Sequence, residues 1–273
     1  MIIEMLPWAL FLLFVFAMLA LDLGPERRIA VFAPNSAGAV LAYLGCLLAG
    51  VASVPVNFHL TAEELVYILE DSGARVLLVG PKSVDVGMEA AAKAGVATVI
   101  GWDCPARPGL VRWEDWFAAA SAAAPPTDMK PLPHLHYTSG TTGRPKATET
   151  PPTYFPQAET IDGFVVQMAQ RAALLPKGPG LAVGPLYHTG PLTMVRALAG
   201  GAPLVSMASF ESEAVLRTIQ ELKIAASVMV PTHFQRLLAL PEGVRNKYDV
   251  GSMQRLAHTG AACPREVKQL MID

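Results

Sequence analysis

Short runs of β-branched and other apolar residues alternate with longer helical segments along most of this 273-residue chain. The first run, at Arg28–Ala33, is followed by a helical pattern over Ser36–Ala49, and the same rhythm continues to the end of the chain. Such alternation is typical of a mostly parallel sheet that is covered by helices. The predicted fold class is therefore α/β, with mostly parallel sheets covered by helices.

Local signals place the other elements. The segment Thr61-Ala-Glu-Glu64 has the pattern of a capping box, which predicts a helix from there to about Asp71. A helix from Trp113 to Ala123 is expected to end at Pro125-Pro126. The further predicted strands are Val51–Val56, Ala74–Val79, Ala97–Ile100, His134–Tyr137, Leu181–Gly184, Pro203–Met207, Ala225–Val230 and Arg255–His258. The further predicted helices are an alanine-rich one before Ala97, then Ala158–Leu174, Glu211–Leu222, His233–Leu240 and Arg265–Met271.

The segment Tyr137-Thr-Ser-Gly-Thr-Thr-Gly-Arg-Pro-Lys146 combines two glycines with several hydroxyl groups and a lysine. Gly140 and Gly143 allow a tight turn and a close backbone approach to a ligand, and successive N–H groups in such a turn form a concave anion site. The side-chain donors are Ser139, Thr141, Thr142 and Lys146. The segment predicts a triphosphate cradle in which the threonines also offer contacts to Mg²⁺. It is not a P-loop, which needs four residues between its glycines and a Ser or Thr after the lysine.

The strand predicted at His134–Tyr137 leads directly into this loop. A parallel strand would present the loop at its carboxyl end, where open α/β sheets place their ligands. The alternative is a surface turn rich in glycine, serine and threonine that binds nothing.

Composition excludes some classes of partner and site. Charged residues make up 16% of the chain, the net charge is −2, and no basic stripe of the kind that binds nucleic acid is present. The three cysteines are odd in number and far apart, and no two have the C-x-x-C spacing of a metal or redox site; they are Cys46, Cys104 and Cys263. A disulfide framework is therefore not expected, and the predicted location is cytoplasmic.

Residues 1–24 form a separate segment, because residues 5–21 carry no charge and include four aromatic side chains. That run is slightly shorter than the ~20 residues that span a bilayer. One interpretation is a membrane anchor, in which case Arg27 and Arg28 would hold the following chain on the cytoplasmic side. The alternatives are a buried core helix or a start site that differs from the native one.

The loop sequence resembles the signature of the adenylate-forming superfamily, which includes acyl-CoA synthetases, luciferases and the adenylation domains of peptide synthetases. Three further stretches are similar to the same superfamily in the expected order. Val51–Leu78 resembles fatty-acyl-CoA synthetases, and Gly184-Pro-Leu-Tyr-His-Thr-Gly190 resembles a motif beside the acyl and thiol channel. Met229–Leu238 and Thr259-Gly-Ala-Ala-Cys-Pro264 resemble the segments that lead to the adenine pocket.

The resemblance implies roles for particular residues. Those that would bind ATP through the phosphate loop are Thr138, Ser139, Gly140, Thr141, Thr142, Gly143 and Lys146, with Thr141 or Thr142 near Mg²⁺. His188 would line the carboxylate or pantetheine side of the site, and Lys146 and His188 are the predicted catalytic residues. Gly260 and Ala261 would lie against the adenine or the acyl group.

Each of these roles has a structural alternative. His188 could be an ordinary hydrogen-bonded interior histidine. Gly260 to Ala262 could be small residues at a strand end. His233 and His258 have no motif support beyond their position and are interpreted as structural.

The resemblance also has limits, because the chain stops at Asp273. The family's acidic metal ligand, ribose-binding aspartate and small C-terminal domain with its lysine would lie beyond that point. Residues 25–273 are thus expected to form a partial AMP-binding domain whose last sheet exposes an edge. The predicted function is an acid–thiol ligase that uses ATP, Mg²⁺ and coenzyme A to activate a carboxylic acid. A fatty acid is the expected substrate class, and aryl or alicyclic acids are the alternatives. The alternative is a catalytically incomplete fragment that at most binds nucleotide or pairs with a missing half.

Overall fold

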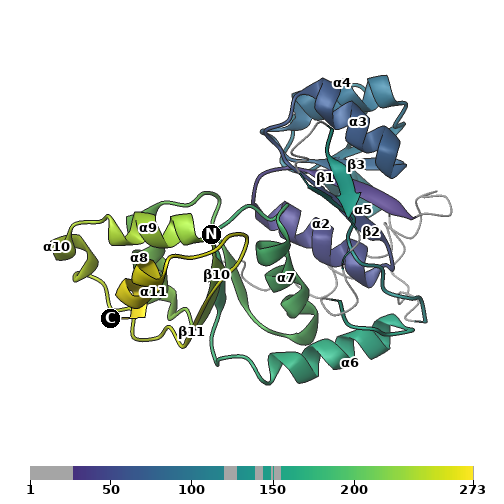
Figure 1. Ribbon diagram of the computed structural model, residues 1–273. Coiled ribbons are helices and arrows are strands. Elements are labelled where there is room, and N and C mark those ends of the chain that lie inside the picture. The colour runs from purple at the N-terminus through teal and green to yellow at the C-terminus, as the bar shows by residue number, and fades with distance from the viewer. Residues whose placement is uncertain (1–26, 120–127, 139–143, 149, 151–154, 273) are drawn as a thin grey trace. The chain divides into compact units, whose positions relative to one another are not determined.

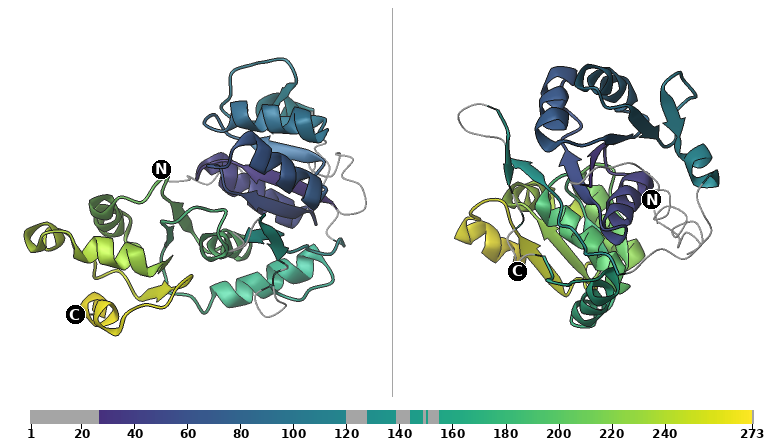
Figure 2. Two further views of the ribbon diagram at one scale, coloured as in Figure 1. Left: turned by 45° about the horizontal axis from the view of Figure 1, so that its top comes forward. Right: turned by 90° about the vertical axis from the view of Figure 1, so that its right-hand side faces the viewer.

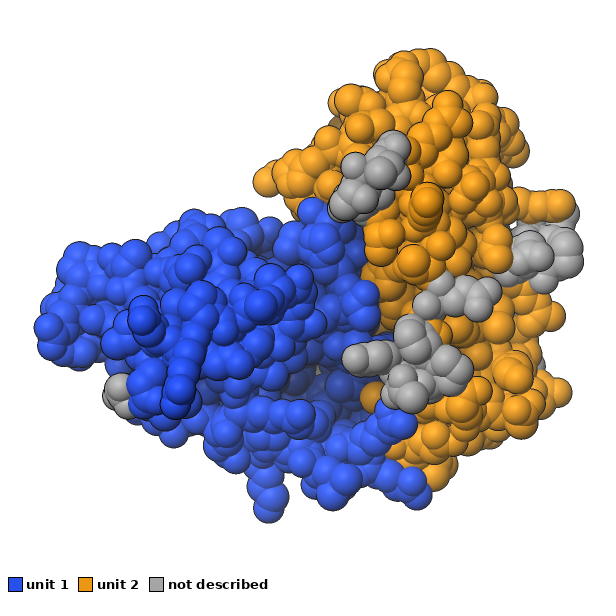
Figure 3. Space-filling model, viewed as in Figure 1, with its two compact units in different colours: residues 1–3, 169–273 blue, residues 4–168 orange. Residues whose placement is uncertain are grey.

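The computed structural model describes residues 27–119, 128–138, 144–148, 150 and 155–272. These residues belong to two compact units (Figure 3), one up to Met168 and the other from Ala169 onward. The boundary falls inside helix α6 (Ile161–Ala172). Each unit contains its own parallel sheet, so the two are described separately.

The sheet of the first unit has five parallel strands in the order β2-β1-β3-β4-β5 (Figure 1). Strand β1 is the first in the chain and lies between β2 and β3, with Arg28 paired with Ala52 and Ile29 paired with Val76. The strands are β1 (Arg28–Phe32), β2 (Ala52–Val56), β3 (Val76–Val79), β4 (Thr98–Gly101) and β5 (Leu110–Arg112). Strands β1, β2 and β3 are buried along nearly their whole length, as expected for a parallel sheet with both faces covered.

Helices cover both faces of this sheet. They are α2 (Ala37–Leu48), α3 (Ala62–Ser72), α4 (Val84–Ala94) and α5 (Trp113–Ala118). Helices α3 and α4 lie side by side (Figures 1 and 2) and bury Leu65, Leu69 and Ala90 against Phe32 and Leu77. Helix α2 contacts β1 and β2 and begins at Ser36, whose hydroxyl accepts a hydrogen bond from the amide of Ala39. The alternation of side chains along the strands supplies an apolar surface to each layer.

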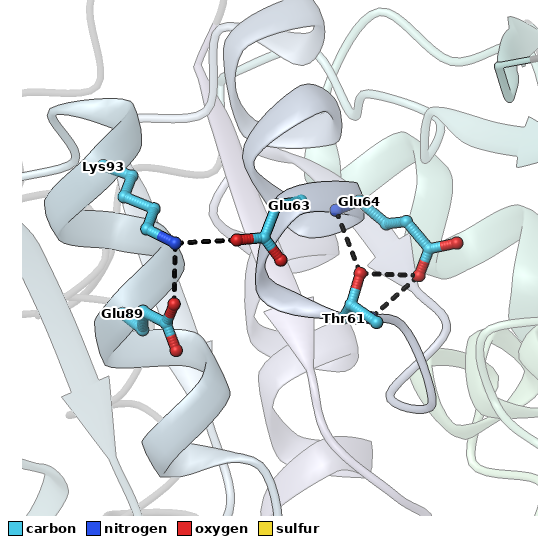
Figure 4. Close-up of polar contacts among 5 residues, drawn as sticks. All are labelled: Thr61, Glu63, Glu64, Glu89 and Lys93. Carbon is cyan, nitrogen blue, oxygen red and sulfur yellow. Dashed lines mark hydrogen bonds and ion pairs between the residues drawn. The ribbon is translucent and has the colours of Figure 1, made fainter.

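The predicted capping box at the start of α3 is present (Figure 4). The Thr61 hydroxyl accepts from the amide of Glu64, and the Glu64 carboxylate accepts from the amide of Thr61 at 2.8 Å. On the neighbouring helix α4, the Lys93 ammonium lies 2.8 Å from a carboxylate oxygen of Glu63 and 2.7 Å from one of Glu89. The cap fixes the first turn of α3, and the exposed ion pairs add little to stability because water screens them.

The sheet of the second unit has four parallel strands in the order β11-β10-β8-β9. They are β8 (Gly180–Ala182), β9 (Leu204–Ser206), β10 (Ala226–Met229) and β11 (Arg255–His258). One face packs on α8 (Ser212–Leu222) and α9 (Pro231–Leu238) through Val215, Ile219 and Phe234. Helix α7 (Thr189–Ala197) lies on the other face and is followed by a single 3₁₀ turn, η2 (Leu198–Gly200). Two short helices complete the unit, α10 (Glu242–Arg245) and α11 (Arg265–Ile272).

A separate two-stranded antiparallel ribbon joins β6 (His136–Thr138) to β7 (Lys146–Thr148). Of the strand predicted at His134–Tyr137, the last two residues lie in β6, and its expected place in an open parallel sheet is wrong. The return strand begins only eight residues after β6 ends, and so short a connection allows antiparallel pairing alone. Lys146–Thr148 is only three residues long, too short for a periodic pattern of apolar residues to predict it.

Most other predicted elements are confirmed to within a few residues. Of the helix predicted over Trp113–Ala123, the structure shows α5 at Trp113–Ala118, and residues 120–123 lie outside the described residues. Helix α7 was not predicted, because Gly190 and Pro191 lie in its first turn and suggest a loop. None of the helices among the described residues is long and apolar enough to cross a membrane. The apolar run at 5–21 lies outside those residues, so its interpretation stays open.

Candidate functional site

The ribbon of β6 and β7 holds both ends of the predicted phosphate loop. Thr138 and Lys146 are direct partners across the ribbon, and the Thr138 hydroxyl donates to the carbonyl oxygen of Lys146 at 3.4 Å. Both side chains are exposed. The loop residues between them, Ser139, Gly140, Thr141, Thr142 and Gly143, lie outside the described residues, and their predicted contacts stay predictions.

The base of the ribbon is fixed to the first sheet. The Leu135 amide donates to the carbonyl oxygen of Ser53 in β2 at 2.9 Å, which continues the edge of the sheet into the ribbon. His134 and His136 are buried, with ring centroids 4.2 Å apart in an edge-to-face arrangement. The ribbon therefore leaves a packed base and ends in two exposed residues, Thr138 and Lys146.

Tyr137 attaches the middle of the ribbon to α3. Its hydroxyl donates to Oδ2 of Asp71 at 2.6 Å, a short bond of the charge-assisted kind. Burial raises the pKa of Tyr137, and the neighbouring Asp71 carboxylate raises it further. The phenol is therefore a neutral donor throughout the physiological pH range.

In the second unit, three predicted segments meet at the carboxyl edge of the sheet. The segment Gly184–His188 follows β8, Val230 follows β10, and Thr259–Ala261 follows β11. The strand order reverses at β8, because β9 lies on one side of it and β10 on the other. Parallel sheets usually bind ligands outside the carboxyl ends of their strands at such a reversal. The structure thus brings His188, Gly260 and Ala261 to the edge where a ligand is expected.

His188 occupies the N-cap position of α7. Its backbone is extended, and its side chain makes no capping hydrogen bond. The ring centroid lies 4.5 Å from that of Tyr187. The residue is exposed, and burial of part of the ring lowers its pKa. A neutral imidazole at a helix start can donate or accept a hydrogen bond to an approaching polar group.

Glycines keep this edge closely packed without filling it. A methyl group built on Gly190 would lie 3.0 Å from Cγ2 of Thr259, and one on Gly184 would lie 3.1 Å from Cγ of Pro191. Gly260 has a positive φ of 81°, a conformation that favours glycine. These glycines let the turns after β8 and β11 approach each other.

His233 is a residue that sequence reasoning left aside. Its Cε1 atom would lie 3.8 Å from a Cβ built on Gly184, so it stands beside the segment that carries His188. The ring stacks on Phe210 at 4.2 Å with an interplanar angle of 7°. Burial lowers its pKa, and the nearby Arg236 charge lowers it further. The available signal was its position two residues after Pro231, in the first turn of a helix that follows a strand.

Two other features of the described residues carry no assigned role. A cavity of about 730 Å³ lies near the amino ends of the second sheet, where Gly180, Leu204, Ala226 and Arg255 line it. It is therefore at the opposite end of the strands from His188. In the described part of the chain, no group of three His, Cys, Asp or Glu side chains could hold a metal ion. Thr141 and Thr142, the predicted Mg²⁺ contacts, lie outside that part.

The described residues define an α/β protein with two parallel sheets and a short antiparallel ribbon. The chain belongs to the family of AMP-binding enzymes, because the sequence model of that family matches residues 16–272. The expected superfamily and fold class are both confirmed.

Individual relatives show the extent of the similarity. The chain is 29% identical over 272 residues to 3-[(3aS,4S,7aS)-7a-methyl-1,5-dioxo-octahydro-1H-inden-4-yl]propanoyl:CoA ligase of Rhodococcus jostii, covering 91% of this chain and 50% of the relative. It is 28% identical over 253 residues to feruloyl-CoA synthase of an Amycolatopsis species, covering 91% and 47%. The solved structure of a Mycobacterium tuberculosis fatty acyl CoA synthetase superposes with a TM-score of 0.74 at 24% identity, covering 97% and 50%. The chain thus spans about half the length of the curated relatives it matches.

Proposed function

We propose that this chain provides the ATP- and acid-binding part of an acid–thiol ligase. The observation that carries the proposal is the pairing of Thr138 with Lys146 across a ribbon that encloses the phosphate-loop sequence of the AMP-binding family. The pairing places an ammonium group and a hydroxyl group at the two ends of the loop. The ammonium group suits the triphosphate of ATP, whereas the Thr138 hydroxyl holds the ribbon by donating to the carbonyl oxygen of Lys146.

The proposed reaction has two steps. A carboxylate oxygen of the acid attacks the α-phosphorus of ATP, the bond to the bridging oxygen breaks, and pyrophosphate leaves with its electron pair. The product is an acyl-adenylate. The sulfur of coenzyme A then attacks the acyl carbon, and AMP leaves as the thiol loses its proton. Lys146 would offset the negative charge that develops on the pyrophosphate in the first step.

Residues of the second unit would serve the acid and the thiol. His188 would line the carboxylate or pantetheine side, and its neutral ring suits a hydrogen bond to either group. Gly260 and Ala261 are exposed and small, so they would admit the flat adenine or the acyl group. Mg²⁺ would accompany ATP, but no described residue is assigned to it and no step above depends on it.

The proposed substrate class is a hydrophobic carboxylic acid. Relatives are named for an alicyclic propanoate and for ferulate, and a structural neighbour is named for fatty acids. The similarity of Val51–Leu78 to fatty-acyl-CoA synthetases favours a fatty acid among these classes. The proposal includes the cytoplasmic location that the three free cysteines favour.

The proposal is tested by pyrophosphate release from the folded chain with MgATP and a panel of fatty, aromatic and alicyclic acids. Lys146→Ala should lower acid-dependent release about 10²-fold, the usual cost of removing one well-placed stabilising group. Lys82→Ala is the matched control, because it removes another exposed lysine of the same unit. Release that is absent with every acid, or equal in both variants, would contradict the proposal.

A second candidate function is association with a polypeptide that corresponds to the other half of the relatives, on the same chain or a separate one. Helix α11 has no buried residue, and Leu270 and Ile272 are 58% and 79% exposed. Among the described strands, none pairs with the outer edge of β11. Exposed apolar side chains on a helix and an open strand edge are features that a further strand-helix unit would cover.

Co-expression with the second half of an acyl-CoA ligase tests this association. Leu270→Asp should weaken co-purification of the two polypeptides. Leu174→Asp is the control, because Leu174 is 85% exposed at the end of α6. Equal weakening by both substitutions, or no association at all, would contradict the second candidate.

A further inference from the structure

Helix α3 presents two side chains, one turn apart, to the ribbon that carries Lys146. The Tyr67 hydroxyl donates to the carbonyl oxygen of Pro145 at 3.1 Å, at the start of β7. Asp71 accepts the 2.6 Å hydrogen bond from Tyr137 in β6. Residues four apart lie on the same face of a helix. One helix face therefore holds both strands of the ribbon, and each bond crosses more than 60 residues of sequence.

A third contact strengthens the attachment on the side of β7. The guanidinium carbon of Arg144 lies 5.0 Å from the centroid of the Tyr67 ring. That distance is within the range of a cation–π interaction. Tyr67 therefore meets two consecutive residues, Arg144 and Pro145, immediately before Lys146. The ring and the hydroxyl of one side chain together fix the backbone that leads into the lysine.

Helix α3 is itself well anchored. Leu65, Ile68 and Leu69 are buried against the first sheet. At the carboxyl end of the helix, a guanidinium nitrogen of Arg28 donates to the carbonyl oxygen of Ser72 at 2.8 Å. The capping box fixes the other end. A helix that is held at both ends and along one face is a rigid support for the ribbon on its other face.

We propose that Tyr67 and Asp71 are positioning residues, which hold the ribbon so that Lys146 stays in place for the phosphates of ATP. This inference rests on the proposed function. Lys146 is exposed on a short ribbon of three residue pairs, and such a ribbon is barely stable alone. Electrostatic stabilisation depends on charges that are already in place when the substrate arrives. The contacts to α3 hold Lys146 in place before ATP arrives, and Tyr67 and Asp71 do this without contacting the nucleotide themselves.

Cleavage by trypsin after Lys146 measures opening of the ribbon directly. The bond after Arg144 resists trypsin because proline follows it, so Lys146–Ala147 is the bond to monitor by mass spectrometry. Cleavage of a transiently open segment follows the population of the open form. Tyr67→Phe should speed cleavage about fivefold, as expected for one ordinary hydrogen bond. Tyr137→Phe should speed it about tenfold, because its bond to the carboxylate is stronger.

Tyr248→Phe is the matched control. Its hydroxyl donates to Oε1 of Glu213 at 2.7 Å in the second unit, so its loss removes a similar bond away from the ribbon. This variant should cleave after Lys146 at the wild-type rate. Asp71→Ala should behave as Tyr137→Phe does, and Asp71→Asn should recover part of the protection because an amide oxygen also accepts.

Calorimetric titration with MgATP completes the test. The Kd for MgATP should rise as the closed, binding-competent fraction of the ribbon falls, most in the variant that is cleaved fastest, and Tyr248→Phe should leave it unchanged. Unchanged cleavage would overturn the proposal, and so would faster cleavage with an unchanged Kd, which would make the contacts merely structural. If the wild-type chain fails to bind MgATP, the proposed function fails, and with it the positioning role. Cleavage would then show separately whether α3 holds the ribbon.

Discussion

The two parallel sheets of this chain share a topological feature but use it differently. In the first, β1 lies between β2 and β3; in the second, β8 lies between β9 and β10. The strand order therefore reverses at β1 in the first sheet and at β8 in the second. Each reversal leaves a crevice at the carboxyl ends of the strands. In the first sheet side chains fill that crevice. In the second sheet the corresponding edge carries exposed residues, including His188 and Gly260.

The filled crevice is built around Trp102, which is 3% exposed. Its ring lies against Gly80, which follows β3, and against Gly38, which lies in the helix that follows β1. Ser83 closes the remaining gap, because its hydroxyl donates to the carbonyl oxygen of Phe32 and accepts from the amide of Gly80. Both sheets thus have a crevice because of their strand order, but the volume of the neighbouring side chains decides whether that crevice can receive a ligand.

The largest expected effect comes from emptying the filled crevice. Trp102→Ala should lower the free energy of unfolding by about 3–5 kcal/mol, the range for a buried aromatic residue replaced by alanine. Urea unfolding followed by circular dichroism measures it. Trp116→Ala is the control, because Trp116 is only half-buried, and it should cost less than half as much. Equal losses would mean that the crevice at β1 is no more tightly filled than the surface.

The next effect comes from adding one carbon atom at each crevice. A Cβ on Gly38 would lie 2.5 Å from Nε1 of Trp102, and Gly38→Ala should therefore cost about 1–3 kcal/mol in urea unfolding. Gly190→Ala should cost less than about 1 kcal/mol, because its neighbour Thr259 is exposed and can shift. Gly243→Ala, with no atom within 4 Å in helix α10, should be neutral or slightly stabilising. A larger loss of unfolding free energy at Gly190 than at Gly38 would mean that the edge of the second sheet is packed more tightly than the crevice of the first.

Local signals in the sequence were enough to predict most of the fold. The capping box at Thr61 and the strand at Arg255–His258 lie where they were expected. Their signals depend on neighbouring residues alone. The ribbon could not be placed in this way, because its pairing depends on the short return strand from Lys146.

Contacts between distant residues explain what sequence reasoning missed in the candidate site. Trp102 has no motif, and only its packing against Gly38 and Gly80 shows that it fills a crevice. The attachment of Tyr137 to Asp71 crosses 66 residues and has no sequence signal. His188 was predicted from the motif Gly184–Gly190, whereas His233, in the similar stretch Met229–Leu238, was interpreted as structural although it stands beside Gly184.

A change at the open edge should alter chemistry rather than stability. His188→Ala should leave the free energy of unfolding within about 0.5 kcal/mol of the wild type, because the side chain makes no capping bond. Under the proposed function, it should slow acyl-CoA formation from acyl-adenylate about tenfold, equal to ~1.4 kcal/mol in activation free energy. Rapid-quench measurement of the thioester step tests this. A large loss of stability would show that His188 is an interior residue and would remove the contrast with Trp102.

The smallest expected effect is a dependence on pH at the open edge. His233 is neutral in the folded chain over a wider range than in the unfolded one, because burial and the Arg236 charge lower its pKa from 6.5. Above pH 6.5 the ring is neutral in both states and costs nothing. As pH falls below 6.5 the unfolded chain binds the proton first, so stability is lost until the folded ring is protonated as well. Wild-type unfolding free energy should therefore fall between pH 7.5 and pH 5.

Carboxylates also contribute to that fall, so the useful quantity is the difference between wild type and His233→Gln. Glutamine at the third helical position can accept the bond that Nδ1 of His233 receives from the Val230 amide at 3.5 Å. It keeps the helix start and removes the titration. The variant should lose less stability than the wild type over this pH range in urea unfolding. An equal loss would mean that solvent reaches His233 freely, and that the edge beside Gly184 is more open than its packing indicates.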